Sequence, residues 1–589
     1  MTKLRHWAFY LLLLAGTCAL SACLPEVFAE KADYKLGGLE KQVSLNDDVK
    51  KFLDNRAAEI KPLKPSSPDA AYYEAAKTRS LRDDLKAYMD SKGYYDSEIN
   101  FSAGKHPWSG VYKVSSGAQY KISDVSVSPA AYAGHLKNLR KGQVLDAENV
   151  LLAEKQLHDD IARGKCFFSL DVENEVTLDR KAKTARISFR VTAAGQATFG
   201  TLAFEGNKDV QEAYLRKLPN WKAGDCFDRA KLEELRVALF ESGLFSAVDF
   251  QLPEARPRNG RVPVTVRVTE RAPRTISAGV SYYSDEGPGV TLGWKHRNLF
   301  GQAESLDTEL TLSPILQKLS GTLTKPFFLR NDQQIALNAA LKREDTDGYL
   351  TTGIESGVTL SRKFSKRMSG SSGAKLSFKK IEDEVTRQTD DFLLLSFPQG
   401  LIYDSRDNAL DATQGWLLNG NVEPYIAAVG DKPLFLKTEF SARKYHAVGK
   451  NVVVAGRAKI GSILGPATAS LPATERFYSG GGGSVRGFGY QEVGPVRNGS
   501  PEGGRSIIEG SAEARFRFND TLGGVVFVDA GEVNNGLFPD MGDLSVGAGA
   551  GLRYYTGFGP LRLDVAVPVT NKETASSAYQ VYLSIGQAF

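Results

Sequence analysis

Alternation of apolar and polar residues through the C-terminal half of the chain is the feature that most constrains its fold. The segments 506–518, 543–555 and 559–569 place apolar side chains at every second position, with charged or small residues between them. This pattern predicts antiparallel strands with one apolar and one polar face, as in a soluble sandwich or a transmembrane barrel. At roughly 20 residues per strand and connection, residues 273–589 would supply about 16 strands.

Several observations favour the barrel over the sandwich. The alternation predicts strands of about 9 to 11 residues, which is enough for a tilted strand to cross the hydrocarbon core. Their charged residues share the face that would line the lumen, where water solvates them. Only a closed barrel leaves no unpaired strand edge in lipid. The high content of glycine (57 residues), phenylalanine (30) and tyrosine (23) is typical of such barrels, but a soluble all-β protein would have a similar composition.

Residues 1–29 predict a signal peptide. A basic start precedes an apolar stretch over 7–20 that is too short to span a bilayer. Two cleavage sites compete: LSAC would leave Cys23 lipidated at the mature N-terminus, whereas VFA, which ends at Ala29, suits ordinary signal peptidase. Either reading takes the chain out of the cytoplasm.

Residues 141–194 and 223–271 are two copies of one pattern. Each copy begins Gly-x-x-x-Asp, continues with an amphipathic helix and turns at a glycine into alternating strands. A further strand precedes each copy, and a weaker first copy lies upstream at 79–102. The predicted unit is therefore β-α-α-β-β, about 75 to 80 residues long and repeated in tandem.

These units resemble POTRA modules. The resemblance rests on the order of the elements and on the helix-to-strand turn SGLFSAVDF at 242–250. It implies a multidomain chain in which tandem α+β modules precede the transmembrane antiparallel β-barrel. The expected boundaries are 34–117 for module 1, 118–195 for module 2, 196–272 for module 3 and 273–589 for the barrel.

Two cysteines lie within the predicted modules, and an exported chain meets an oxidising compartment. In the POTRA alignment, Cys166 starts a strand of module 2 and Cys226 precedes the long helix of module 3. A disulfide between them would hold two neighbouring modules at a fixed angle. Two separate buried thiols are the alternative.

The whole chain resembles the outer-membrane insertase superfamily that includes BamA, TamA and the two-partner secretion transporters. A glycine run leads into SVRGFGY at 484–490, which is similar to the lid-loop motif of that family. The segment GGVVFVDAGEV at 523–533 is similar to the strand that faces this loop. WKHRNLFG at 294–301 and YDSRDNALDATQGW at 403–416 are similar to earlier barrel segments, and the chain ends on an aromatic residue.

The motif predicts a lock inside the barrel, made by Arg486 with its neighbours Gly487 and Phe488. Glycines let the loop turn back into the lumen, where Asp529 would point by the period of two. An arginine fork on a carboxylate is a strong, charge-assisted contact in a partly dry lumen. We therefore predict that Arg486 pairs with Asp529, that Glu513 is a second candidate partner, and that a charge swap rescues each single variant.

A second prediction concerns closure of the barrel. The first strand, near 275–283, would pair with the last, which runs from Tyr579 to the terminal Phe589. Gly586 interrupts this last strand and would let it bend inward. Fewer ladder hydrogen bonds would then hold the seam, which would open sideways and offer a template to a client strand.

The resemblance implies an outer-membrane assembly or translocation factor rather than an enzyme. Three modules indicate a TamA-like member with a TamB-like inner-membrane partner, autotransporter-type clients and outer-membrane lipid around the barrel. A secretion pore for one exported substrate and a passive channel are the alternatives. The residues predict no catalytic group, metal or cofactor: the histidines are scattered, GAGAG at 547–551 lies within a strand, and a net charge of +5 gives no reason to expect nucleic acid.

Overall fold

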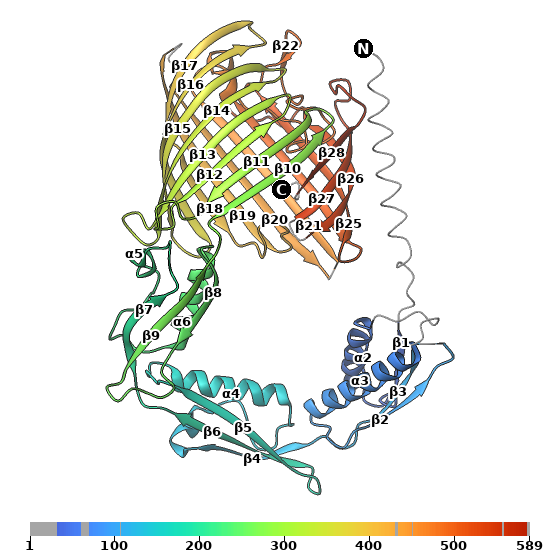
Figure 1. Ribbon diagram of the computed structural model, residues 1–589. Coiled ribbons are helices and arrows are strands. Elements are labelled where there is room, and N and C mark those ends of the chain that lie inside the picture. Colours follow the sequence, from blue (N-terminus) through green and yellow to red (C-terminus); the bar gives the residue numbers. More distant parts are fainter. Residues whose placement is uncertain are drawn as a thin grey trace. The chain divides into compact units, whose positions relative to one another are not determined.

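The computed structural model describes residues 32–60, 70–106, 108–429, 434–449, 451–556 and 559–585 (Figure 1). The predicted signal peptide, Cys23, Gly586 and Phe589 lie outside these residues. The chain divides into two units. One comprises the chain up to Thr201 with Ala223–Asp228 and Pro253–Pro263, and the other comprises Leu202–Lys222, Arg229–Leu252 and Val264–Phe589. None of the described helices is long and apolar enough to cross a membrane.

Module 1 folds as a three-stranded sheet with two helices against it. The sheet has the order β1-β3-β2, with β1 parallel and β2 antiparallel to the central β3. The helices bury apolar stripes at helical spacing, such as Leu81, Leu85 and Met89. The elements are β1 (Asp33–Gly37), α2 (Val43–Ala58), α3 (Ala70–Ser91), β2 (Glu98–Ala103) and β3 (Ser109–Ser115).

Modules 2 and 3 have the same order of strands but only one long helix each. Asp146 begins the helix of module 2 as its N-cap, because its carboxylate accepts a hydrogen bond from the amide of Glu148 at 2.8 Å. The other predicted helix is reduced to a 3₁₀ turn in module 2 and to one α-turn in module 3. The elements are β4 (Lys121–Ser128), η1 (Ala130–His135), α4 (Ala147–Ala162), β5 (Leu170–Asp179), β6 (Thr184–Ala193), β7 (Thr198–Glu205), α5 (Glu212–Leu215), α6 (Arg229–Glu241), β8 (Phe245–Gln251) and β9 (Arg261–Glu270).

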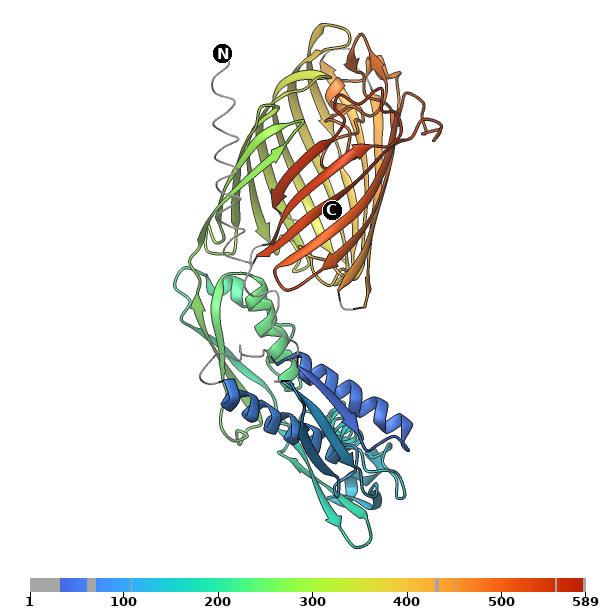
Figure 2. The same ribbon diagram turned by 90° about the vertical axis from the view of Figure 1, so that its right-hand side faces the viewer.

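The rest of the described chain forms a closed antiparallel barrel. Figure 2 shows its last strands, drawn in red, beside the first ones in green. The strands are β10 (Arg274–Tyr283), β11 (Gly287–His296), β12 (Ser305–Leu312), β13 (Leu316–Pro326), β14 (Gln333–Asp345), β15 (Tyr349–Lys363), β16 (Met368–Asp383), β17 (Gln388–Ser396), β18 (Gln399–Asp404), β19 (Gly415–Val429), β20 (Leu434–Val448), β21 (Val452–Leu464), β24 (Ser506–Arg517), β25 (Leu522–Asn534), β26 (Ser545–Thr556), β27 (Gly559–Pro568) and β28 (Gln580–Ile585).

The wall has sixteen strand positions, although seventeen strands are named in it. Both β17 and β18 pair with β16 on one side and with β19 on the other, so together they occupy one position. Pro398 lies between them, and a proline cannot donate a hydrogen bond to the ladder. The predicted architecture, α+β modules followed by a barrel of about 16 strands, is confirmed.

Side chains alternate across the wall as the sequence predicts. On β27, Leu563 and Val565 are exposed on the outer face, whereas Arg562 and Asp564 between them are buried in the lumen. We call the end where Arg274 begins β10 the proximal end, since module 3 leads into it. The opposite end, where β10 ends, is the distal end.

Candidate functional site: the lumenal loop and the seam

A 41-residue connection between β21 and β24 enters the lumen and contacts the wall there. This lumenal loop, residues 465–505, includes two 3₁₀ turns, η2 (Thr468–Ser470) and η3 (Ala473–Glu475), and a short hairpin formed by β22 (Val496–Arg497) and β23 (Ser500–Pro501). Val485 and Phe488 are fully buried in it. The loop is therefore an internal plug of the barrel.

Arg486 of the lumenal loop forms an ion pair with Asp529 on β25 of the wall. Its Nε donates to Asp529 Oδ2 at 2.6 Å and its Nη2 donates to Oδ1 at 2.9 Å, and its backbone amide also donates to Oδ2, at 3.2 Å. The contact is bidentate and only 2% of the Arg486 residue surface is exposed. The guanidinium carbon lies 3.4 Å from the centre of the Phe527 ring, a cation–π contact.

Two further carboxylates complete the surroundings of Arg486. Its Nη2 lies 2.8 Å from Glu513 Oε1, and its Nη1 donates to Asp564 Oδ2 at 3.1 Å. The structure thus brings together the three residues Arg486, Asp529 and Glu513 that the sequence singled out. Asp564 on β27 is an additional partner, and its lumen-facing position in an alternating strand was the available signal.

The same acids also bind arginines of the wall. Arg553 Nη1 and Arg562 Nε donate to the oxygens of Asp564 at 2.5 and 2.7 Å, and Arg515 Nη2 lies 2.9 Å from Glu513. Asp529 differs from these two acids. In the described part of the chain its ion pair is with Arg486, while the hydroxyl of Ser511 donates to it at 2.5 Å. The loop therefore supplies the cation that Asp529 lacks on the wall.

A row of glycines on the lumenal face of β26 makes room for this cluster. A Cβ on Gly547 would lie 1.8 Å from the carbonyl oxygen of Arg486, and one on Gly551 would lie 1.9 Å from Asp564 Oδ1. A Cβ on Gly549 would lie 2.4 Å from the Phe527 ring. These glycines belong to GAGAG at 547–551. The alternation of glycine with alanine is visible in the sequence, but it did not predict that the loop packs against these glycines.

Gly487 and Phe488 link the lumenal loop to the last strand. The amide of Gly487 donates to the hydroxyl of Tyr582 on β28 at 3.2 Å, and that hydroxyl donates to the carbonyl of Phe488 at 3.3 Å. Gly487 has φ +102°, which a side chain would disfavour. The tip of the loop is thus fastened to β25, β27 and β28.

A second anchor lies nearer the start of the lumenal loop, and sequence reasoning missed it. Glu475 accepts a hydrogen bond from Lys379 Nζ at 2.8 Å through its carboxylate and one from Lys437 Nζ at 2.9 Å through its carbonyl. Arg476 Nη2 donates to Asp383 Oδ2 at 2.7 Å. The adjacent charges Glu-Arg are ordinary in a loop, so their burial was not predictable without the tertiary fold.

The barrel closes by a short contact between its first and last strands. In the described residues, β10 and β28 share two register pairs, Tyr282 with Leu583 and Tyr283 with Tyr582. Beyond them the amide of Ser284 donates to the carbonyl of Val581 at 3.0 Å. By comparison, β10 shares ten register pairs with β11, and β28 shares six with β27. Among the described residues, this seam therefore has the fewest register pairs of any two neighbouring strands in the barrel.

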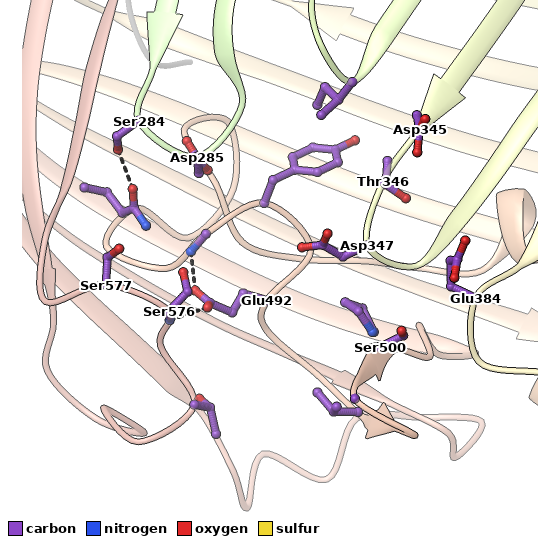
Figure 3. Close-up of a pocket in the computed structure, with 18 of the residues that line it drawn as sticks. Ser284, Asp285, Asp345, Thr346, Asp347, Glu384, Glu492, Ser500, Ser576 and Ser577 are labelled. Atoms are coloured by element: carbon purple, nitrogen blue, oxygen red, sulfur yellow. Dashed lines mark hydrogen bonds between the residues drawn. The ribbon is translucent and has the colours of Figure 1, made fainter. Parts of the chain in front are cut away.

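Tyr579, predicted as a seam residue, lies one position before β28 and is exposed. It lines a cavity of about 1040 Å³ at the distal end of the seam, together with Ser284 and Gln580. Five carboxylates line this cavity (Figure 3): Asp285, Asp345, Asp347, Glu384 and Glu492. Among the described residues, no group of acidic, histidine or cysteine side chains is arranged to hold a metal ion.

Cys166 and Cys226 are joined by a disulfide with a Cα–Cα distance of 5.0 Å. Next to it, the ring of Phe227 stacks on Phe168 at 5.9 Å and contacts Phe199 at 5.1 Å. The disulfide and the three rings therefore connect module 2 to the part of module 3 that lies in the same unit.

Comparison with known proteins agrees with this geometry. Residues 298–589 match the Omp85 superfamily domain, and residues 197–271 match the POTRA model, a surface antigen variable number repeat. The chain is 22% identical over 545 residues to the outer membrane protein assembly factor BamA of Nitratidesulfovibrio vulgaris, covering 86% of this chain and 67% of that protein. It is 24% identical over 537 residues to BamA of Neorickettsia risticii, covering 84% and 70%.

A solved structure shares the fold. The crystal structure of BamA from Haemophilus ducreyi lacking POTRA domains 1-3 superposes with a TM-score of 0.65 at 18% identity, over 80% of this chain and 100% of that one. The relatives named here are thus of the BamA type, and none of them carries the expected finer likeness to TamA.

Proposed function

We propose that this chain, which belongs to the Omp85 superfamily, is an assembly factor that inserts β-barrel proteins into the outer membrane. The barrel lies in the outer membrane and the modules lie in the periplasm. Its relatives in Nitratidesulfovibrio vulgaris and Neorickettsia risticii are named outer membrane protein assembly factors. No nucleotide, metal or catalytic group takes part in the proposed activity.

The seam is the observation that carries the proposal. Eight of the ten residues of β10 have no register partner in the described part of β28. Every second one of them turns its amide and carbonyl away from β11, so these groups form an edge without a described partner, and an edge inside a membrane is costly unless another strand pairs with it. A client strand that pairs with this edge satisfies those groups. The wall of the assembly factor then serves as the template for the client barrel.

The modules supply the second component, which is capture of the unfolded client. Each module leaves edge strands at the sides of its sheet, because the central strands are β3, β6 and β9. An extended chain adds to such an edge through main-chain hydrogen bonds, with little dependence on sequence. Clients are therefore recognised as extended chains rather than by a motif.

Three α+β modules before the barrel support the finer proposal of a TamA-like role, with a TamB-like inner-membrane partner and autotransporter-type clients. The test is a pull-down of the tagged chain from detergent-solubilised envelopes. Recovery of a large inner-membrane partner supports this role. Recovery of outer-membrane client proteins without such a partner instead supports an assembly role without this finer likeness.

A disulfide across the seam tests the proposed insertion mechanism. Tyr282→Cys with Leu583→Cys joins the outward-facing register pair, and oxidation should abolish insertion of a reporter barrel into proteoliposomes, with recovery on reduction. The matched control is Leu292→Cys with Leu310→Cys, a register pair within β11 and β12. Full insertion activity with an oxidised seam would show that the seam does not open.

The alternatives differ in what passes through the lumen. The lumenal loop occupies that path and is anchored at both Glu475 and Arg486, which disfavours a passive channel. Ion conductance in planar bilayers separates the possibilities. A large, steady conductance without a client would support a channel, and conductance that rises only with one exported substrate would support a secretion pore.

A further inference from the structure

The outer surface of the barrel carries a groove that the proposed assembly function does not use. Leu401 on β18, Gly420 on β19, Phe440 on β20 and Ile460 on β21 are register partners across four neighbouring strands. Leu401, Phe440 and Ile460 present large exposed apolar side chains to the outside. Gly420 presents none, so the row has a notch one side chain wide.

The notch continues toward the distal end over a row of mixed side chains. In this next outward-facing row, Gln399, Val422, Thr438 and Ser462 are register partners, and Gln399 Nε2 donates to the carbonyl of Phe397 at 3.3 Å. The hydroxyl of Thr438 donates to the carbonyl of Ser462 at 3.1 Å, so it adds little free polar surface. Together the two rows bound a cavity of about 460 Å³.

Phe538, from the β25–β26 connection, lies against the distal end of this groove. The connection is fastened to the outer wall beside it, because the hydroxyl of Ser462 donates to the carbonyl of Leu537 at 2.7 Å. Arg505 Nε also donates to the carbonyl of Asn535 at 3.0 Å. The Phe538 residue is 68% exposed, which is unfavourable in water and favourable against hydrocarbon.

We propose that this groove, with Gly420 at its floor and Phe538 at its end, binds one acyl chain of a lipid in the membrane leaflet at the distal end. The groove is continuous with the exposed apolar side chains of the outer wall, which faces hydrocarbon. A peptide segment would bring a series of amides and carbonyls to a lining whose outward polar groups are the Gln399 amide and two hydroxyls that already donate hydrogen bonds, whereas an acyl chain brings none. The inference depends on the membrane location of the barrel and not on its assembly activity.

Photolabelling tests the proposal on the full chain. The protein is placed in nanodiscs of phosphatidylethanolamine and phosphatidylglycerol, with a minor fraction of phosphatidylethanolamine that carries a diazirine in its acyl chain. Mass spectrometry then maps the labelled peptides after illumination. We expect peptides containing Phe440, Ile460 and Phe538 to be labelled about fivefold more than equally exposed outer peptides of β11 and β13.

Two glycine variants give a matched comparison. A Cβ on Gly420 would lie 3.9 Å from Phe440, and one on Gly456, also facing outward, would lie 3.8 Å from the carbonyl oxygen of Ser511, so both sites have room. Gly420→Leu fills the notch and should remove the excess labelling, whereas Gly456→Leu should retain it. Phe538→Ala, which lies in a connection outside the wall, should reduce it about fivefold without affecting folding.

Three results would overturn the proposal. Labelling could follow exposed apolar area evenly around the barrel, or the two leucine variants could behave alike, including equal loss in both. The chain could also run as a dimer whose groove is protected from label, which would make the occupant a second copy. Heat-induced mobility shifts on gels verify that each variant carries a folded barrel.

Discussion

Replacement of Arg486 by alanine should release the tip of the lumenal loop while the wall stays folded. The variant removes two guanidinium hydrogen bonds to Asp529, one to Asp564 and the ion pair with Glu513. Asp564 keeps Arg553 and Arg562, and Glu513 keeps Arg515. Asp529, in contrast, is left with the Ser511 hydroxyl and the amide at position 486 as its donors among the described residues. The cost therefore comes mainly from one buried carboxylate that has lost its cation.

The expected magnitude follows from that count. Hydrogen bonds to charged groups contribute about 1.5–3 kcal/mol each, and removal of one partner from a buried ion pair costs about 3–5 kcal/mol. We therefore expect the free energy of local loop opening to fall by about 3–5 kcal/mol. That corresponds to about two to three and a half orders of magnitude in the opening equilibrium, since each factor of ten is about 1.4 kcal/mol.

Hydrogen exchange of the peptide 480–490 measures this opening directly, because amide protection reports local opening free energies. Asp529→Ala should cost less than Arg486→Ala, because Arg486 would keep Glu513 and Asp564. The structure also revises the expectation that a charge swap rescues. An aspartate at position 486 would face those same two acids, so the Arg486→Asp, Asp529→Arg double variant should remain defective.

The matched control is Arg517→Ala, because Arg517 forms a half-exposed ion pair with Asp411 at 3.3 Å. Such surface pairs contribute about 0–1 kcal/mol, so protection of the loop should not change in this variant. An Arg486→Ala effect no larger than that of the control would refute the lock. So would full rescue by the charge swap, since it would mean that Glu513 and Asp564 do not act on the loop.

Three further predictions rest on other contacts. Gly547→Ala should also lower protection of 480–490, because the added Cβ would clash with the carbonyl of Arg486. Unchanged hydrogen exchange would mean that the loop does not pack against Gly547. Burial, with repulsion from Asp285, raises the pKa of Glu286 to about 7. The β10–β11 turn that holds it should therefore resist proteolysis best below about pH 4.5 and lose this stability as the pH rises through about 7. Glu286→Gln should weaken the dependence and leave the smaller part due to Asp285, whose pKa burial also raises. Reduction of Cys166–Cys226, which closes a 60-residue separation, should destabilise the modules by about 4 kcal/mol and shift gel mobility, with no shift in Cys226→Ser.

The wall of the barrel was predictable because its rule is local. A period of two places Leu563 and Arg562 on opposite faces whatever the neighbouring strands are. The number of strand positions in the wall was also predictable, because strand length is fixed by membrane thickness. The break at Pro398 did not change that number, since β17 and β18 occupy the same position between β16 and β19.

Contacts between distant segments were predictable only where a single residue type restricted the choice. A buried arginine needs a carboxylate, and few acids share the lumenal face near Arg486, so Asp529 and Glu513 could be selected. Glu475 was not selected, because a glutamate beside an arginine in a loop gives no sign of burial, and its partners Lys379 and Lys437 lie on two separate strands, β16 and β20. The glycines of β26 were visible, but their purpose depends on which loop lies against them.

The contacts of β28 indicate which side of the seam moves. This strand shares six register pairs with β27, and its Tyr582 hydroxyl also binds the lumenal loop, whereas it shares two described pairs with β10. When the seam opens, β28 should therefore stay with β27 and the loop, and β10 should separate.

Tyr582→Phe tests this assignment, because it removes the hydroxyl and keeps the ring that meets Tyr283 edge-to-face at 5.7 Å. Two buried backbone groups of the loop then lose their partner, at a cost of about 1–3 kcal/mol each. If the loop holds β28 in register, the oxidation rate of the Tyr282→Cys, Leu583→Cys pair should fall severalfold in this background. The same rate with and without the hydroxyl would mean that the strand ladder alone positions β28, and that the lumenal loop has no part in setting the seam.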